Sequence, residues 1–227
     1  MIISSVGIFY FLEGLILLGA SFKLSGSYRK TRNTITKNFS FLFSFLTLTF
    51  FSWSLPSLLA PGNGFLLNIG SLLGEVFIFT GFAFGMRAFV ATRFPRIPLN
   101  PISFTVILIG AFILYLNATI FGSSQLNPRG IIEWHLHPMA VAIYAMMIMF
   151  LTIPLGIEFF RMAIIDKETR ERSLIFGFSS FLAGAGGVLV IMNIPWQVLL
   201  FGHIILFLGI VFIGWAVFLT EKPEKPR

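Results

Sequence analysis

The residues with the clearest potential for chemistry stand together in the stretch IIEWHLHPMAV, residues 131–141. It holds Glu133, Trp134, His135 and His137 directly before Pro138, and the chain has only three histidines in all. On a helix, His135 and His137 would lie about 200° apart and could not share a ligand. The residue before a proline avoids helical geometry, and proline favours the first turn of a helix. We therefore expect a helix to begin at Pro138 and residues 133–137 to be extended.

An extended segment would place Glu133, His135 and His137 on one side, because alternate residues of an extended chain point the same way. Imidazoles and carboxylates are ligands that zinc and similar divalent ions accept. The sequence therefore predicts a divalent-metal site at these three residues. A turn at the membrane surface is the alternative interpretation, with Trp134 as an anchor at the level of the lipid head groups. Haem binding is a third.

Three further ionisable residues fall inside apolar segments: Glu13, Glu75 and His203. Such side chains cost several kcal/mol at bilayer depth and often mark function. Without a Lys or Arg at mid-membrane, each glutamate must be protonated, hydrogen-bonded or facing a wet cavity. We predict that at least one of them faces the bundle interior, and that the three contribute to a ligand site or a proton pathway; a purely structural hydrogen bond is the alternative. Glu158, near the end of its segment, is expected to pair with Arg161.

Composition predicts the elements that must position these residues. Apolar residues make up 56% of the chain and charged residues 11%, and the mean hydropathy is +0.91. A soluble domain carries about 25% charged residues, so this chain needs the lipid bilayer as its solvent. Cysteine is absent, which excludes disulfides, thiolate metal sites and cysteine nucleophiles.

Seven apolar segments, each close to the roughly 20 residues that a membrane-spanning helix needs, divide the chain. They cover residues 3–22, 39–60, 66–90, 101–122, 138–160, 173–193 and 196–219. Their unbroken apolar character differs from the alternation of a membrane barrel. We predict an all-α, polytopic bundle of seven transmembrane helices in a prokaryotic plasma membrane, with one domain at 1–220 and a short charged tail at 221–227.

The basic residues predict the orientation of this bundle. All sixteen Lys and Arg residues except Arg129 lie in alternate connections and in the tail. By the positive-inside rule, the N-terminus is outside and the C-terminus is cytoplasmic. The net charge of +7 then reflects topology and attraction to anionic lipid head groups, and nucleic acid is not an expected partner.

The third segment carries glycines on a single helical face. Gly70, Gly74, Gly81 and Gly85 are spaced by 4, 7 and 4 residues. Small residues let helix backbones approach closely in lipid, so this face is predicted to pack tightly against a neighbour. A ligand cleft floored by the same face is the alternative. The AGAGG run at 183–187 is also typical of close packing or a local bend.

Three stretches resemble the seven-helix sensory regions at the N-termini of prokaryotic histidine kinases. They are FSFLFSFLTLTFFSWSL after a short basic loop, GEVFIFTGFAFGMRAF, and RERSLIFGFSSFLAGAGGVL after a charged loop. The resemblance covers most of the chain and implies a membrane sensor. In such proteins the last helix continues into a signalling helix and a kinase domain, whereas Pro223 and Pro226 here would break that continuation.

We therefore expect a sensor-like or ligand-binding module without an attached output domain, which signals through a cytoplasmic or membrane partner. One alternative is a small transporter or proton-coupled permease with Glu13 and Glu75 in its pathway. Another is a metal- or haem-dependent membrane enzyme built around His135, His137 and His203.

Overall fold

Seven helices make up almost all of the structure, a computed structural model that describes residues 4–120, 124–127, 130–134, 136–192 and 195–219. All seven are long and apolar enough to cross a membrane, which confirms the predicted all-helical architecture. The helices are α1 (Ser5–Thr31), α2 (Thr34–Leu59), α3 (Gly64–Arg93), α4 (Leu99–Ala118), α5 (Pro138–Ile165), α6 (Arg170–Ile191) and α7 (Trp196–Phe218).

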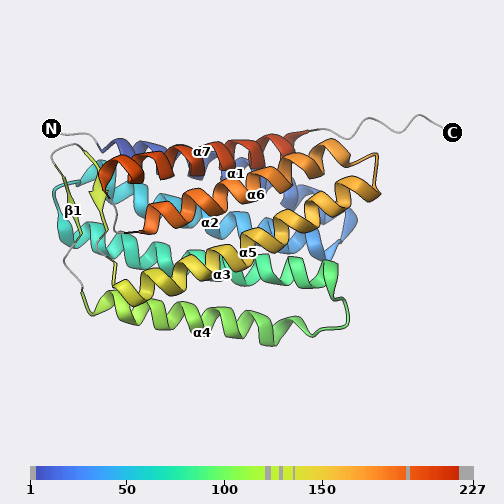
Figure 1. The fold of residues 1–227 in the computed structure, drawn as a ribbon, viewed down its shortest axis with the longest axis horizontal. Helices are drawn as coiled ribbons and strands as arrows, with labels where there is room; N and C mark the ends of the chain where they lie inside the picture. The colour runs from blue at the N-terminus through green and yellow to red at the C-terminus, as the bar shows by residue number, and fades with distance from the viewer. Residues whose placement is uncertain (1–3, 121–123, 128–129, 135, 193–194, 220–227) are drawn as a thin grey trace.

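The helices form a bundle in which sequence neighbours run antiparallel, and α7 returns to pack against α1 (Figure 1). Helix α4 lies along one edge of this bundle and packs mainly against α3. A short antiparallel hairpin of β1 (Gln125–Leu126) and β2 (Ile132–Glu133) lies at the end of the bundle where α5 begins. We call this the hairpin end.

Every Lys and Arg among the described residues lies in the other half of the bundle, which we call the basic end. Helices extend further there than the apolar segments predicted. Helix α1, expected to end near residue 22, continues to Thr31. The length of an apolar segment predicts only the part of a helix that lies in lipid. At the polar end of α1, hydrogen bonds of 2.6 Å join it to α2, one between the Ser21 and Ser44 hydroxyls and one between those of Ser25 and Ser40.

The glycine face of α3 packs closely against its neighbours, as predicted. A Cβ atom added at Gly70 would lie 2.5 Å from the carbonyl oxygen of Ser52, and one at Gly74 would overlap the indole ring of Trp53. Both of these neighbours belong to α2. The face is therefore a packing surface that brings the α2 and α3 backbones together.

Candidate ligand site

The three ionisable residues of the apolar segments all lie inside the bundle. The exposed fraction of the residue is 0% for Glu13, 1% for Glu75 and 0% for His203. The prediction that at least one glutamate faces the interior is confirmed, since both do. Glu158 behaves differently: it lies near the basic end, and its carboxylate accepts hydrogen bonds from Arg161 Nε at 3.1 and 3.2 Å, as expected for an interfacial pair.

Glu75 belongs to a hydrogen-bonded chain that links three helices at the hairpin end. Asn117 Nδ2, in the last turn of α4, donates to Glu75 Oε1 of α3 at 2.7 Å. Asn117 Oδ1 in turn accepts the backbone N–H of His137, which precedes α5, at 2.9 Å. Asn117 was not singled out from the sequence, although a lone amide in an apolar segment is a signal of the same kind as a lone carboxyl.

A cluster of aromatic rings stands beside Glu75. The ring centroids of Tyr10 and Trp53 lie 5.3 Å apart, those of Tyr10 and Trp134 lie 6.3 Å apart, and those of Trp53 and Trp134 lie 6.4 Å apart. Trp134 Nε1 donates to Tyr10 Oη at 3.2 Å, and Trp53 Nε1 donates to the carbonyl oxygen of Ser71 at 3.5 Å. The rings therefore come from α1, α2 and the segment before α5, and hydrogen bonds fix the two indoles.

These rings and Glu75 line a cavity of about 20 Å³, which we call the small cavity. Tyr144 of α5 lines it as well. Within the described residues, Glu75 Oε2 and Tyr144 Oη are buried and make no hydrogen bond. A volume of this size accommodates one water-sized group, and buried polar atoms normally have partners. Two residues in the wall of the small cavity, Glu75 and Tyr144, thus each carry a buried polar atom that makes no hydrogen bond among the described residues.

Glu13 and His203 lie on the α1–α7 side of the same aromatic cluster. The His203 ring stacks on Phe9 with centroids 6.5 Å apart and meets Tyr10 edge-on at 5.1 Å. Neither Glu13 nor His203 lines the small cavity. Among the described residues, no hydrogen-bond partner is found for the Glu13 carboxyl or for either nitrogen of the His203 ring. Tyr10, which was not singled out from the sequence, is the side chain that lies next to both His203 and the small cavity.

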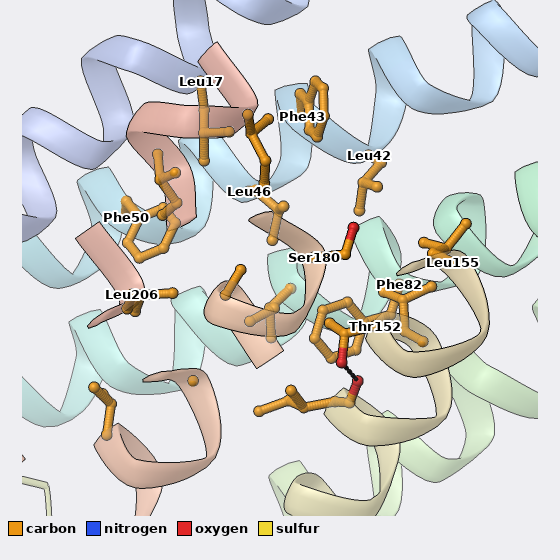
Figure 2. Close-up of a pocket in the computed structure, with 18 of the residues that line it drawn as sticks. Leu17, Leu42, Phe43, Leu46, Phe50, Phe82, Thr152, Leu155, Ser180 and Leu206 are labelled. Carbon is orange, nitrogen blue, oxygen red and sulfur yellow. Dashed lines mark hydrogen bonds between the residues drawn. The ribbon is translucent and has the colours of Figure 1, made fainter. Parts of the chain in front are cut away.

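A second cavity of about 130 Å³ lies inside the bundle on the basic side of the first, and we call it the large cavity (Figure 2). Its walls are almost wholly apolar, including Leu17, Leu46 and Phe82. Two of the three hydroxyls on its lining residues are bonded within their own helices: Thr152 donates to the carbonyl of Ile148 at 2.8 Å (Figure 2), and Ser180 donates to that of Phe176 at 2.8 Å. The third belongs to Tyr144, which also lines the small cavity. The cavity therefore suits an apolar group.

The two cavities adjoin, because they share four wall residues: Trp53, Tyr144, Val190 and Ile191. Trp53 and Tyr144 therefore stand between a polar, aromatic compartment and an apolar one. The described part of the bundle places a hydrogen-bonding site next to a hydrocarbon-like site.

The segment before α5 follows the predicted geometry where the structure describes it. Helix α5 begins at Pro138, and His137 is extended, with φ −60° and ψ 130°. His137 Nδ1 accepts the backbone N–H of Met139 at 3.2 Å, and Glu133 Oε1 accepts from Asn127 Nδ2 at 3.2 Å. The start of α5 is confirmed.

The metal site predicted at Glu133, His135 and His137 depends on a residue outside the described part of the chain, His135. Within the described residues, no three His, Cys, Asp or Glu side chains gather closely enough to hold a metal ion. The divalent-metal site stays a prediction. Metal analysis of the purified protein against a variant with His135→Ala and His137→Ala would test it.

Comparison with known proteins gives no relative: no protein-family model matches the chain, and no curated protein or solved structure is significantly similar to it. The resemblance to histidine-kinase sensory regions is therefore neither supported nor opposed by a match.

Proposed function

We propose that this protein is a sensor-like membrane module that binds a small amphiphilic ligand within its helix bundle. One observation carries the proposal: the small polar cavity and the large apolar cavity share Trp53, Tyr144, Val190 and Ile191 as walls. A molecule with a compact polar end and an apolar body would occupy both at once, passing between Trp53 and Tyr144.

The volumes limit the size of this ligand. An apolar cavity of roughly 150 Å³ in another protein binds benzene, and the large cavity, at about 130 Å³, is of similar size. A ring or a short alkyl chain would fill it, whereas the two chains of a membrane lipid would not fit. The ligand class that we propose is therefore a small molecule with a six-carbon body rather than a bulk lipid.

A transport pathway through the bundle receives less support. An ion or proton would have to travel from the polar residues near Glu75 to the basic end, and the large cavity lies in between. The Thr152 and Ser180 hydroxyls there are bonded to their own helices. An apolar chamber is a barrier to ions and a favourable place for a hydrocarbon, so it favours ligand binding over transport.

We further propose that the hairpin end faces outward and that the basic end meets the cytoplasm, where a signalling partner would dock. The concentration of Lys and Arg at one end supports this orientation. A topology reporter inserted near Gly62 should report an external location, and one fused after Arg227 a cytoplasmic one. Reversed signals would refute the orientation.

Binding can be tested with radiolabelled 1-hexanol, dialysed to equilibrium against the protein in lipid nanodiscs. We expect a saturable component of one site per chain above the linear uptake by lipid. Gly187→Phe should abolish it, because Gly187 lines the large cavity and its added Cβ would make only ordinary contacts, at 3.5 Å from Ile148 Cδ1. The ring would then fill the chamber.

Gly26→Phe is the matched control, since a Cβ at that position of α1 would have no atom within 4 Å apart from its chain neighbours and the backbone of its own helix. It should bind hexanol as the wild type does. Equal saturable binding by wild type and Gly187→Phe, or no saturable binding by any form, would refute the proposed function.

A further inference from the structure

We infer that the polar end of the ligand is a primary ammonium group, held by Glu75 and Tyr144 within the ring cluster of Tyr10, Trp53 and Trp134. This inference rests on the proposed function, because it assigns the head-group chemistry of the same site. Charge, ring arrangement, hydrogen-bonding capacity and size each support it.

The carboxyl group of Glu75 favours a positively charged head group on the ligand. Glu75 brings a carboxyl group into the small cavity, while every described Lys and Arg lies toward the basic end. Its partner Asn117 is an uncharged amide that binds only Oε1. A carboxylate at this depth is stabilised by an opposite charge, and an ammonium ligand would supply one.

The aromatic rings around the small cavity also favour a positively charged head group. Tyr10, Trp53 and Trp134 stand within 6.4 Å of one another, centroid to centroid, and all three line the small cavity together with Glu75. Aromatic faces attract cations, Trp most strongly, and groups of such rings are the usual receptors for organic ammonium ions.

Hydrogen bonding distinguishes a primary ammonium from other cations. A primary ammonium carries three N–H donors. Three oxygens on residues that line the small cavity can accept hydrogen bonds from the ammonium group. Glu75 Oε2 and Tyr144 Oη are buried and make no hydrogen bond among the described residues. Tyr10 Oη accepts from Trp134 and keeps a second lone pair. Donors and acceptors therefore match in number.

Size sets the last limit. The small cavity, at about 20 Å³, holds one water-sized group, which is the size of an –NH₃⁺ head. A trimethylammonium head is several times larger and would not enter. The ligand class is thus a primary amine on a short alkyl or aryl body, such as hexylamine or a phenylalkylamine.

The test compares three ligands with the same six-carbon body: hexylamine, 1-hexanol and hexyltrimethylammonium. Dialysis against wild type in nanodiscs of uncharged lipid should give hexylamine an affinity about tenfold or more above that of hexanol, since a hydrogen bond between charged groups exceeds a neutral one by that order. The trimethyl compound should show no saturable binding.

Glu75→Gln should remove most of the preference for the amine and leave hexanol binding unchanged, because glutamine can still accept the Asn117 hydrogen bond. Tyr144→Phe, which keeps the ring and loses the hydroxyl, should reduce hexylamine affinity by a smaller factor. Glu158→Gln is the matched control: it removes a carboxylate that pairs with Arg161 near the basic end, and both ligands should bind to it as to wild type.

The outcomes separate the two proposals. Saturable hexanol binding with no preference for the amine, or a preference that persists in Glu75→Gln, overturns the ammonium inference and leaves the proposed function standing. Tight binding of the trimethyl compound overturns the size argument and with it the primary amine. Absence of saturable hexanol binding overturns the proposed function, and the ammonium inference, which rests on it, is overturned as well.

Discussion

Two helix contacts in this bundle are built in opposite ways. Helices α2 and α3 meet along a face of glycines, where the indole of Trp53 lies directly over Gly74 and Thr49 Oγ1 donates to the Gly74 carbonyl at 3.3 Å. Helices α4 and α5 leave a groove of about 700 Å³ between them, lined on either side by Ile109, Phe112, Met146 and other large apolar side chains.

The difference shows what holds helices together when the solvent is itself apolar. Burying Leu or Phe against another helix gains little over burying it in lipid, so small residues and interhelical hydrogen bonds decide which helices touch. Helix α4 has Gly110, whose Cβ would lie 2.5 Å from Phe79 of α3, and Asn117, which binds Glu75. Toward α5, the hydrogen bond found among the described residues is the one that the backbone N–H of His137 donates to Asn117 Oδ1, and an apolar groove lies beyond it.

Among the variants that test this contrast, Gly74→Leu is expected to lower the free energy of unfolding the most. The added Cβ alone would overlap the Trp53 indole, so α2 and α3 would have to separate. We expect the free energy of unfolding to fall by about 3 kcal/mol, the upper part of the range for overpacking. Titration with sodium dodecyl sulfate in mixed micelles, followed by near-ultraviolet circular dichroism, measures it.

Gly26→Leu provides the matched control for this change. It adds the same side chain to α1 at a position where the new Cβ has no atom within 4 Å apart from its chain neighbours and the backbone of its own helix. The free energy of unfolding should be unchanged or slightly higher, since leucine is the better helix former. If Gly74→Leu and Gly26→Leu lower the free energy of unfolding equally, the glycine face does not hold α2 to α3.

Asn117→Leu should lower the free energy of unfolding by the next largest amount, because Asn117 makes hydrogen bonds that join α4 to α3 and to the start of α5. The change leaves Glu75 Oε1 and the backbone N–H of His137 without their partner. Orphaned buried groups cost about 1–3 kcal/mol, and we expect a loss of unfolding free energy in that range. The same detergent titration measures it.

A double-mutant cycle measures how much of the stability lost in Asn117→Leu comes from its hydrogen bond to Glu75. In a Glu75→Leu background, Asn117→Leu no longer orphans a carboxyl oxygen, so its cost should shrink by a large part of the single-mutant value. Equal costs in both backgrounds would mean that the bond from Asn117 to Glu75 contributes nothing measurable.

The sequence predicted the parts of this structure that depend on local patterns. Apolar length located seven helices, glycine spacing located the tight face of α3, and Pro138 fixed the start of α5. The cost of a charge in lipid predicted that at least one of Glu13 and Glu75 would face the interior, and both are buried. Each of these follows from residues near one another in the chain.

The sequence predicted Glu75 as a site residue but not the residues around it, because these depend on which helices lie side by side. Tyr10 and Trp134 are 124 positions apart, and Asn117 and Glu75 are 42 apart, yet each pair is hydrogen-bonded. Tyrosine and tryptophan are ordinary in apolar segments, so nothing in the chain marked Tyr10 as a neighbour of His203. Intramembrane Asn deserved the same weight as Glu, and that signal was available.

The smallest effect should come from enlarging a side chain that faces the open groove. Ile109 lines the groove between α4 and α5, whereas Ile113, one helical turn further along α4, is fully buried. Ile113→Phe adds ring atoms to a filled interior and should cost about 1–3 kcal/mol of unfolding free energy. Ile109→Phe adds the same atoms to space that lipid or detergent chains occupy, so its cost should stay within about 0.5 kcal/mol. The two variants share helix, residue types and assay. Equal losses would show that α4 packs on α5 as tightly as α2 packs on α3, and the contrast between the two contacts would then fail.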